Sequence, residues 1–288
     1  MCYENLFINQ RIIHSSFPIP QKPMLQFFTT LLQAVLIQLA GLFGIFFIIG
    51  FFQSIIQTKT LQNYQRSLGW KGILWTAWMG TPIHEMGHYF FAKVFHHRVD
   101  SVRIFEPNEE SGNLGHVSHS YNTKSIYQKL GNFFIGAGPM IFGSIVLVIF
   151  LYFFVPNAKE IFNPLFASFN NPLEFLTAIY ESLKNLFAID NISKWNFWLF
   201  FYLSLAVASH MAPSKPDRQG MWRGFFWIVL LMIIINVITL LLGVDITVYI
   251  LNLSQFLGLF IAIFVYGLLL SFLHYLISIL LLVLFRKR

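Results

Sequence analysis

Long apolar segments separated by short polar ones make up most of this 288-residue chain. A membrane-spanning helix needs about 17–25 predominantly apolar residues. Segments close to or above that length lie at about 27–57, 72–95, 130–155, 196–212, 222–243 and 256–285. The pattern predicts an all-α polytopic membrane protein with about six transmembrane helices. Residues 1–26 are then a polar or interfacial segment, and residues 27–288 form a single membrane-embedded domain.

The polar stretch between the second and third apolar segments differs from the rest of the chain. Residues 99–105 partly alternate apolar and polar side chains, residues 107–113 are rich in turn formers, and residues 115–121 could return as a second strand. A small β-hairpin after the second helix is therefore expected. Glu109 and Glu110 are interpreted as a solvated turn rather than as catalytic acids.

Residues 156–195 form the longest connection between apolar segments. Apolar side chains recur there at helical spacing, with charged residues between them: Leu173, Leu176, Ile179, Leu183 and Phe187. This pattern predicts an amphipathic helix that lies on the membrane surface or caps the bundle.

The composition agrees with a membrane location. Only 11% of the residues are charged and 56% are hydrophobic, whereas soluble domains carry about 25% charged residues. The net charge of +7 comes from Lys and Arg in short loops and at the C-terminus, so it does not indicate a nucleic-acid partner. Cys2 is the lone cysteine, which excludes an intrachain disulfide and a cysteine metal site. Residues 1–25 lack the compact apolar core of a cleavable signal peptide.

The distribution of Lys and Arg also predicts an orientation. With six spans, about twice as many of these residues fall on the side of the N-terminus as on the other side. Positive loops face the cytoplasm, so both termini are expected there. One cysteine and a compact chain fit a bacterial cytoplasmic membrane.

A possible metal site lies within the second apolar segment, at His84-Glu85-Met86-Gly87-His88. This H-E-x-x-H spacing places two imidazoles one above the other on a helix, where they can share a metal ion. Glu85 can then act as general base toward a metal-activated water and as proton donor to a leaving amine. An ionised acid in a span costs roughly 2.5–3.5 kcal/mol, which argues against a chance match. Gly87 keeps one helix face small enough for close packing by another helix.

A catalytic zinc site needs a third protein ligand. Asp217 and Asp245 are acids near the ends of predicted spans, and only Asp217 falls on the side where the H-E-x-x-H helix ends. Residues 212–220 are expected to be non-helical and bracketed by prolines. His210 is a competing residue that could ligate zinc, stabilise an oxyanion or hydrogen-bond in the core.

The remaining histidines carry weaker signals. His116 and His119 are interpreted as solvated polar residues, and His96 and His97 as interfacial ones. His274 has no evident partner in the sequence.

These motifs together resemble the site-2 protease family of intramembrane zinc metalloproteases. The run from His84 to Ala92 is similar to that family's H-E-x-G-H-x-x-x-A pattern, and residues 136–139 are similar to its A-G-P motif. Asp217 stands where the family's Pro-rich aspartate motif would be, and the resemblance covers about residues 72–223. The chain departs from the family pattern around Asp217, where Pro216 precedes it, Arg218 follows it and no Asn is present.

The resemblance implies zinc as cofactor and cleavage of membrane-protein substrates near the cytoplasmic face. It implies Glu85 as the catalytic residue, ligation by His84, His88 and Asp217, and close helix packing at Gly87, Gly138 and Pro139. It also implies an extended substrate, for which an edge of the hairpin at 98–121 could provide strand pairing.

Two other functions fit parts of the sequence. A transporter or non-catalytic metal-binding membrane protein could retain the protease-like fold, although such a site would not need Glu85. A membrane-anchored metalloprotease would have a soluble zinc domain and a glutamate ligand downstream, and neither is evident.

Overall fold

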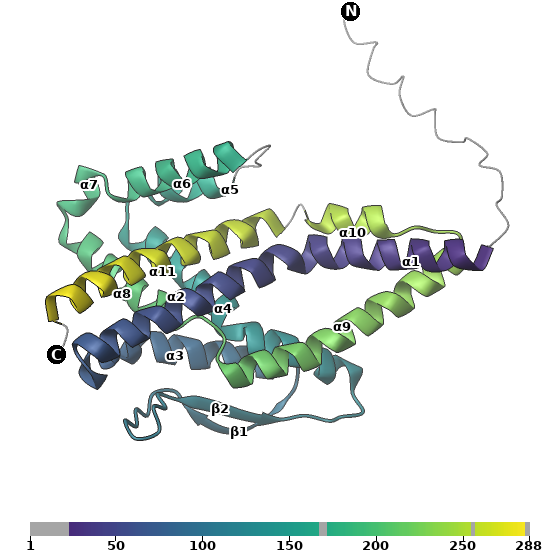
Figure 1. Ribbon diagram of the computed structural model, residues 1–288, viewed down its shortest axis with the longest axis horizontal. Helices are drawn as coiled ribbons and strands as arrows, with labels where there is room; N and C mark the ends of the chain where they lie inside the picture. The colour runs from purple at the N-terminus through teal and green to yellow at the C-terminus, as the bar shows by residue number, and fades with distance from the viewer. Residues whose placement is uncertain (1–22, 167–171, 255–256, 286–288) are drawn as a thin grey trace, which may run out of the picture.

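The computed structural model describes residues 23–166, 172–254 and 257–285, and consists of packed helices with one small sheet (Figure 1). Four described helical stretches are long and apolar enough to cross a membrane: Met24–Ser67, Ile126–Phe154, Lys215–Leu241 and Phe260–Phe285. The protein is therefore a helical membrane-embedded protein.

The predicted number of about six spans is too high by this criterion. The second and fourth segments do form helices, α3 (Trp70–Val94) and α8 (Trp195–Ala208). Helix α3 carries His84, Glu85 and His88, which lower its hydropathy, and α8 has only 14 residues. Both helices lie among the longer ones in the fold (Figure 1).

The first apolar segment is longer than its hydropathy indicated. Helix α1 (Pro23–Leu39) continues through a π-helical turn (η1, Ala40–Gly44) into α2 (Ile45–Ser67). The polar end of α2 stays helical because its side chains are buried against another helix rather than exposed in a loop. Asn63 donates to Ser278 at 3.0 Å, and Tyr64 is hydrogen-bonded to His274 at 2.7 Å. The predicted segment at 1–26 lies mostly outside the described residues.

Helix α4 (Ile126–Phe154) packs against both α3 and α9 (Lys215–Leu241), and these three helices surround the candidate site. Ser125 caps α4 by accepting a hydrogen bond from the Gln128 backbone N–H. Buried apolar side chains from α4, α8 and the C-terminal helix α11 (Leu257–Phe285) form the core beside them.

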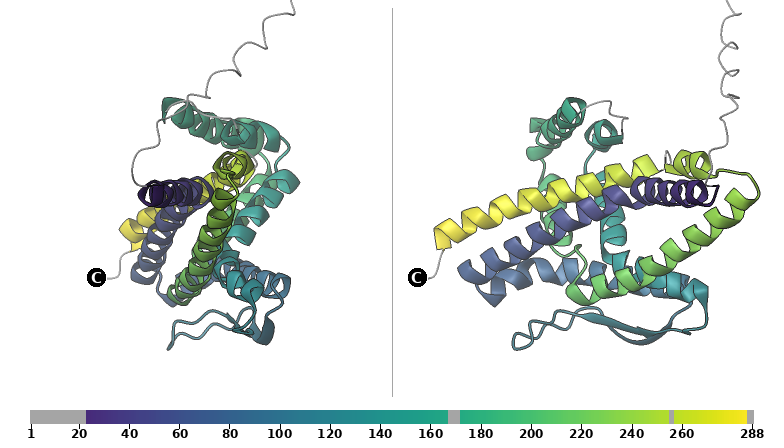
Figure 2. Two further views of the ribbon diagram at one scale, coloured as in Figure 1. Left: turned by 90° about the vertical axis from the view of Figure 1, so that its right-hand side faces the viewer. Right: turned by 45° about the vertical axis from the view of Figure 1, so that its right-hand side comes forward.

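The predicted hairpin is confirmed as two antiparallel strands, β1 (Arg98–Arg103) and β2 (His116–Ser120). Val102 is paired with Val117, and the register shifts between Val99 and Ser101. The hairpin runs along one side of the molecule next to α3 (Figures 1 and 2).

The opposite side carries three shorter helices, α5 (Ala158–Phe166), α6 (Pro172–Leu186) and α7 (Ile189–Ile192) (Figures 1 and 2). Helix α6 is the amphipathic helix that the sequence predicted, and it packs on α5 while Leu173 and Leu176 are exposed. A further short helix, α10 (Thr247–Ser254), lies beside α1 and was not expected.

Candidate metal centre

Helix α3 directs the imidazoles of His84 and His88 toward α4 and α9, and it carries Glu85 between them in the sequence. His88 and Glu85 are buried, and His84 is partly buried. His84 and His88 lie one helical turn apart, so their rings face the same neighbour. Their Nε2 atoms are 3.1 Å apart.

Asp217 from α9 completes this group across the helix interface. Its Oδ1 lies 3.2 Å from His88 Nε2, and its Oδ2 lies 3.6 Å from His84 Nε2. Among the described residues, one group of three or more His, Cys, Asp or Glu side chains has donor atoms close enough together to hold a metal ion. It consists of these three side chains. His84, His88 and Asp217, which the sequence predicts as metal ligands, therefore lie close together.

Backbone carbonyls determine which ring nitrogens face the centre. His84 Nδ1 lies 2.6 Å from the His210 carbonyl oxygen, and His88 Nδ1 lies 2.8 Å from the Ile135 carbonyl oxygen. A carbonyl oxygen can only accept, so each Nδ1 carries the hydrogen and each neutral Nε2 presents a lone pair. Protein metal sites use this kind of outer hydrogen bond to orient a histidine ligand.

These distances suit a small cation at the centre of the three side chains. Two tetrahedral ligand atoms, each 2.0–2.1 Å from zinc, lie about 3.3 Å from one another. The observed separations of 3.1, 3.2 and 3.6 Å fall around that value. Two lone pairs and a carboxylate repel one another unless a cation or a proton lies between them, so the donor chemistry fits a divalent metal.

Asp217 occupies a helix terminus rather than the irregular segment that the sequence suggested. Helix α9 already begins at Lys215, so the expectation of a non-helical run through residue 220 is wrong. Ser214 and Asp217 form a capping box: the Ser214 N–H donates to Asp217 Oδ2 at 2.7 Å, and the Asp217 N–H donates to Ser214 Oγ. Pro216 is tolerated because the first turn needs no backbone donor.

The predicted helix packing at Gly87, Gly138 and Pro139 is confirmed. A Cβ atom placed on Gly87 would lie 2.7 Å from the Gly138 carbonyl group and 2.8 Å from Pro139 N. Glycine at both positions lets α3 and α4 approach backbone to backbone. This approach brings the Ile135 carbonyl, one turn earlier in α4, within reach of His88.

Glu85 lies between the metal-binding group and the hairpin. Glu85 is 6% exposed, and the backbone amide of Val117 in β2 lies close to its carboxyl group. A buried carboxyl group beside the two histidines is suited to accept and return a proton.

His210 lies behind His84 and does not belong to the convergent donor group. Its ring is buried, and its Nε2 is 3.2 Å from Thr76 Oγ1. Of the three roles left open by the sequence, the geometry matches the core hydrogen bond, with the added role of its backbone carbonyl toward His84.

Three other histidines differ from their sequence interpretation. His97 is 4% exposed rather than interfacial, and its Nδ1 lies 3.0 Å from Nδ1 of the half-buried His119. His97 Nε2 donates to the Gln128 carbonyl at 2.8 Å, so His119 must donate to His97. His274, for which no partner was evident, pairs with Tyr64 on α2.

Two polar residues of α2 that sequence reasoning missed hold the segment before Asp217. Gln57 accepts a hydrogen bond from the Ala212 N–H at 2.7 Å, and Ser54 accepts one from Arg218 at 3.1 Å. Their signal in the sequence is the spacing of two polar residues one turn apart, at the point where α2 changes from apolar to polar.

No protein-family model, no curated protein and no solved structure matches the chain. Fold and side-chain chemistry define the class as a helical, membrane-embedded protein with a His–His–Asp donor group between α3 and α9. The likeness to site-2 proteases rests on the three sequence motifs.

Proposed function

We propose that this protein is an intramembrane zinc endopeptidase that hydrolyses peptide bonds of membrane-protein substrates near the cytoplasmic face. The observation that carries the proposal is the convergence of His84 Nε2, His88 Nε2 and the Asp217 carboxylate beside the buried Glu85. The proposal includes a multi-pass arrangement in a bacterial cytoplasmic membrane, with the N-terminus in the cytoplasm. The expected cytoplasmic C-terminus does not fit the fold, because α2 and α11 run in the same direction: Phe46 packs on Phe264, and Asn63 binds Ser278.

His84, His88 and Asp217 would hold the zinc ion. Zinc bound by three protein ligands has one open position, polarises a substrate carbonyl and makes water more acidic. The carbonyls of His210 and Ile135 keep both imidazoles in the ligating tautomer. Asp217 supplies the negative charge that offsets the cation in a region of low dielectric.

Glu85 performs the proton transfers in the proposed reaction. Its carboxylate takes a proton from the attacking water as the new carbon–oxygen bond forms at the scissile carbonyl. Its carboxyl group then delivers that proton to the departing amine as the carbon–nitrogen bond breaks. The backbone amide of Val117 in β2 lies close to this carboxyl group.

The substrate would lie extended next to α3, since a peptide bond inside a helix is shielded from attack. The hairpin lies against the same helix and offers strand edges for backbone pairing. Burial of Glu85 supports catalysis over a purely structural metal site, because a structural site gains nothing from an additional buried acid.

Comparison of the wild type with Glu85→Gln tests the activity. Both proteins would be purified, assayed for zinc, and reconstituted with a panel of single-span membrane proteins. We expect equal zinc content and loss of cleavage by about 100-fold or more, the range for loss of a general base. Glu109→Gln, in the exposed hairpin turn, is the matched control and should cleave like the wild type.

Equal cleavage by the wild type and Glu85→Gln would contradict the proposed role of Glu85. Zinc binding without cleavage of any panel member by the wild type would instead favour the non-catalytic metal-binding protein or transporter.

A further inference from the structure

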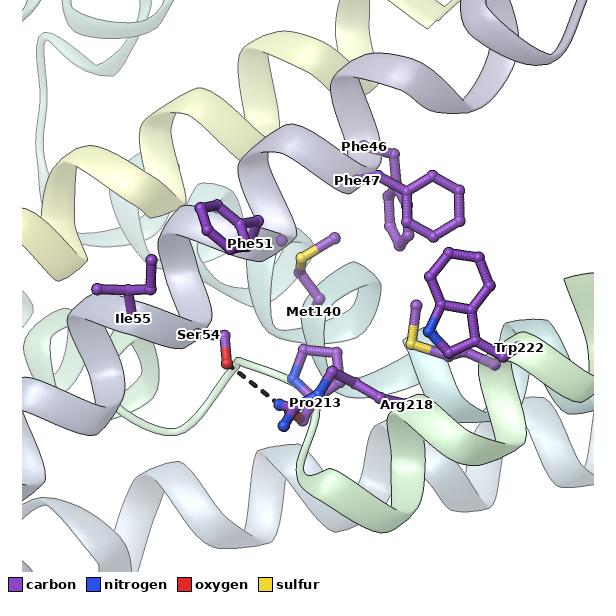
Figure 3. Close-up of a pocket in the computed structure, with 11 residues that line it drawn as sticks. Phe46, Phe47, Phe51, Ser54, Ile55, Met140, Pro213, Arg218 and Trp222 are labelled. Atoms are coloured by element: carbon purple, nitrogen blue, oxygen red, sulfur yellow. Dashed lines mark hydrogen bonds between the residues drawn. The ribbon is translucent and has the colours of Figure 1, made fainter. Parts of the chain in front are cut away.

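An apolar groove opens between α2, α4 and α9, and it is also lined by Pro213 and Arg218, which flank Asp217 in the sequence (Figure 3). Its volume is about 470 Å³, within the range of small-molecule sites. The apolar side chains that line it are Phe46, Phe47 and Phe51 of α2, Met140 of α4, and Met221 and Trp222 of α9. In a membrane-embedded protein, such a groove accommodates hydrocarbon.

One end of the groove carries a positive charge. Arg218 lies there, and its Nη1 donates to Ser54 Oγ at 3.1 Å and to the Pro213 carbonyl at 2.8 Å (Figure 3). Both acceptors are neutral. No carboxylate lies within ion-pair distance of Arg218 in the part of the chain that the structure describes. The neighbouring Asp217 carboxylate lies beside the two histidines instead.

An uncompensated guanidinium at the end of an apolar groove attracts an amphiphile with an anionic head. The hydrocarbon chain of a lipid can fill the apolar groove. The lipid phosphate can accept two parallel hydrogen bonds from the Arg218 guanidinium. Lys215, one turn earlier in α9, is exposed and adds a second positive charge. A zwitterionic lipid brings its own cation to this end of the groove, whereas an anionic lipid does not.

We propose that this groove is a binding site for an anionic phospholipid, with phosphatidylglycerol as its occupant. An acyl chain lies along the phenylalanines of α2, and the phosphate binds the guanidinium of Arg218. The site is separate from the zinc chemistry, and its occupation does not depend on protease activity.

Occupation of the groove would act on the segment that positions Asp217. Arg218 already connects Ser54 of α2 with Pro213, just before α9 begins. A bound lipid adds contacts to both sides of that connection and restrains α2 relative to α9.

Trp222 provides a direct probe of the site. Its ring stacks on Phe47, with ring centroids 5.2 Å apart and an interplanar angle of 4°, so bromine atoms on a bound acyl chain would quench its fluorescence. The full chain would be reconstituted in phosphatidylcholine nanodiscs containing a minor fraction of phosphatidylglycerol, with bromine on the acyl chains of one lipid or of the other. Subtracting the signal of Trp222→Phe isolates Trp222 from the other tryptophans.

We expect brominated phosphatidylglycerol to half-quench Trp222 at about fivefold lower mole fraction than brominated phosphatidylcholine. This ratio corresponds to about 1 kcal/mol for one basic residue acting on an anionic lipid. Arg218→Gln should abolish the preference. Arg223→Gln, which removes a charge from the same helix outside the groove, should keep it.

A second variant tests the apolar part of the site. Gly50 lies in the groove wall, and a Cβ placed there would meet Met140 Sδ at an ordinary 3.5 Å. Gly50→Phe should therefore fill the groove and reduce the quenching of Trp222 by both lipids.

Equal quenching by the two lipids in the wild type, or a preference retained in Arg218→Gln, would overturn the proposal. Insensitivity of Trp222 to either brominated lipid would also overturn it and would indicate another occupant, such as a substrate helix.

Discussion

The two histidines of the candidate metal centre differ in exposure but are oriented by the same kind of partner. Each Nδ1–H donates to a backbone carbonyl, one at His210 and one at Ile135. A carbonyl holds the neutral tautomer without adding charge, which leaves Asp217 as the anionic member of the group. The net charge of the centre with a divalent cation is then +1.

His84, Glu85, His88 and Asp217 could be predicted from the sequence because H-E-x-x-H spacing fixes a helix face and the topology selects one acid. The contribution of His210 could not be predicted, since any residue at that position supplies a carbonyl. Gln57 was missed for a related reason: its partner is a backbone N–H in a distant segment.

The contact between the buried His97 and the half-buried His119 should make the attachment of the hairpin depend on pH. Burial, followed by the nearby His97 ring, lowers the pKa of His119 to about 4. Burial also lowers the pKa of His97. Other charged or titratable groups acting on His119 are His88, Asp100 and Asp217. A detached hairpin would bind a proton near pH 6.5, so the attachment should weaken as the pH falls from about 6.5 toward 4.

Hydrogen exchange of residues 98–120, corrected for the intrinsic effect of pH, measures this attachment. We expect faster exchange at pH 5 than at pH 7 in the wild type. In His119→Gln, which cannot bind the proton, the corrected rates should change less; an identical pH response would exclude His119 as the titrating group.

At the scale of elements, the crossing of α3 and α4 positions the site. Gly87 permits the crossing, and Gly87→Ala would place a Cβ atom 2.7 Å from the backbone of Gly138. Because the backbone there cannot move aside easily, we expect the free energy of unfolding to fall by about 1–3 kcal/mol. Unfolding in mixed micelles with a denaturing detergent measures the change.

Gly220→Ala in α9 is the matched control. The nearest atom to a Cβ there is the Asn132 carbonyl oxygen at 3.9 Å, and alanine favours a helix. Its stability should be unchanged or higher. If Gly220→Ala lowered the free energy of unfolding as much as Gly87→Ala, the close α3–α4 contact would not be the cause of the loss.

The helices and the hairpin were predictable because hydropathy and alternation are local signals. The ends of the helices could not be predicted where tertiary contacts determine them. The polar end of α2 remains helical because α11 covers it, and α9 begins early because Ser214 and Asp217 cap it. His96, in the turn after α3, has a φ of 56°. This left-handed conformation is usually adopted by glycine, so it had no signal in the sequence.

At the scale of the whole molecule, polar pairs join helices from opposite ends of the chain. Gln53 is hydrogen-bonded to Ser271, and Asn63 to Ser278, more than 200 positions apart. Such pairs could not be predicted from one sequence because hydropathy does not reveal which helices are neighbours. Interhelical hydrogen bonds of this kind stabilise membrane bundles where the hydrophobic effect is weak.

The proposed orientation makes a prediction that uses the single cysteine. With the N-terminus in the cytoplasm, Cys2 should resist a membrane-impermeant maleimide in spheroplasts of an expressing bacterium and react in inverted vesicles. Lys184→Cys, made together with Cys2→Ser, places the thiol on the exposed face of α6 and should give the opposite pattern. Labelling of Cys2 from outside would reverse the proposed topology.

The proposed zinc site consists of His84, His88 and Asp217. It can be tested by measuring the zinc content per chain of the purified wild type, Asp217→Asn and Asp245→Asn. We expect one zinc per chain in the wild type and in Asp245→Asn, because the Asp245 carboxylate of the wild type accepts a hydrogen bond from the Thr247 N–H and is not part of the candidate centre. In Asp217→Asn the zinc affinity should fall more than about 100-fold, because even outer partners of a ligand are worth 10- to 100-fold. A wild type without zinc, or equal zinc in Asp217→Asn, would show that these three residues do not form a zinc site.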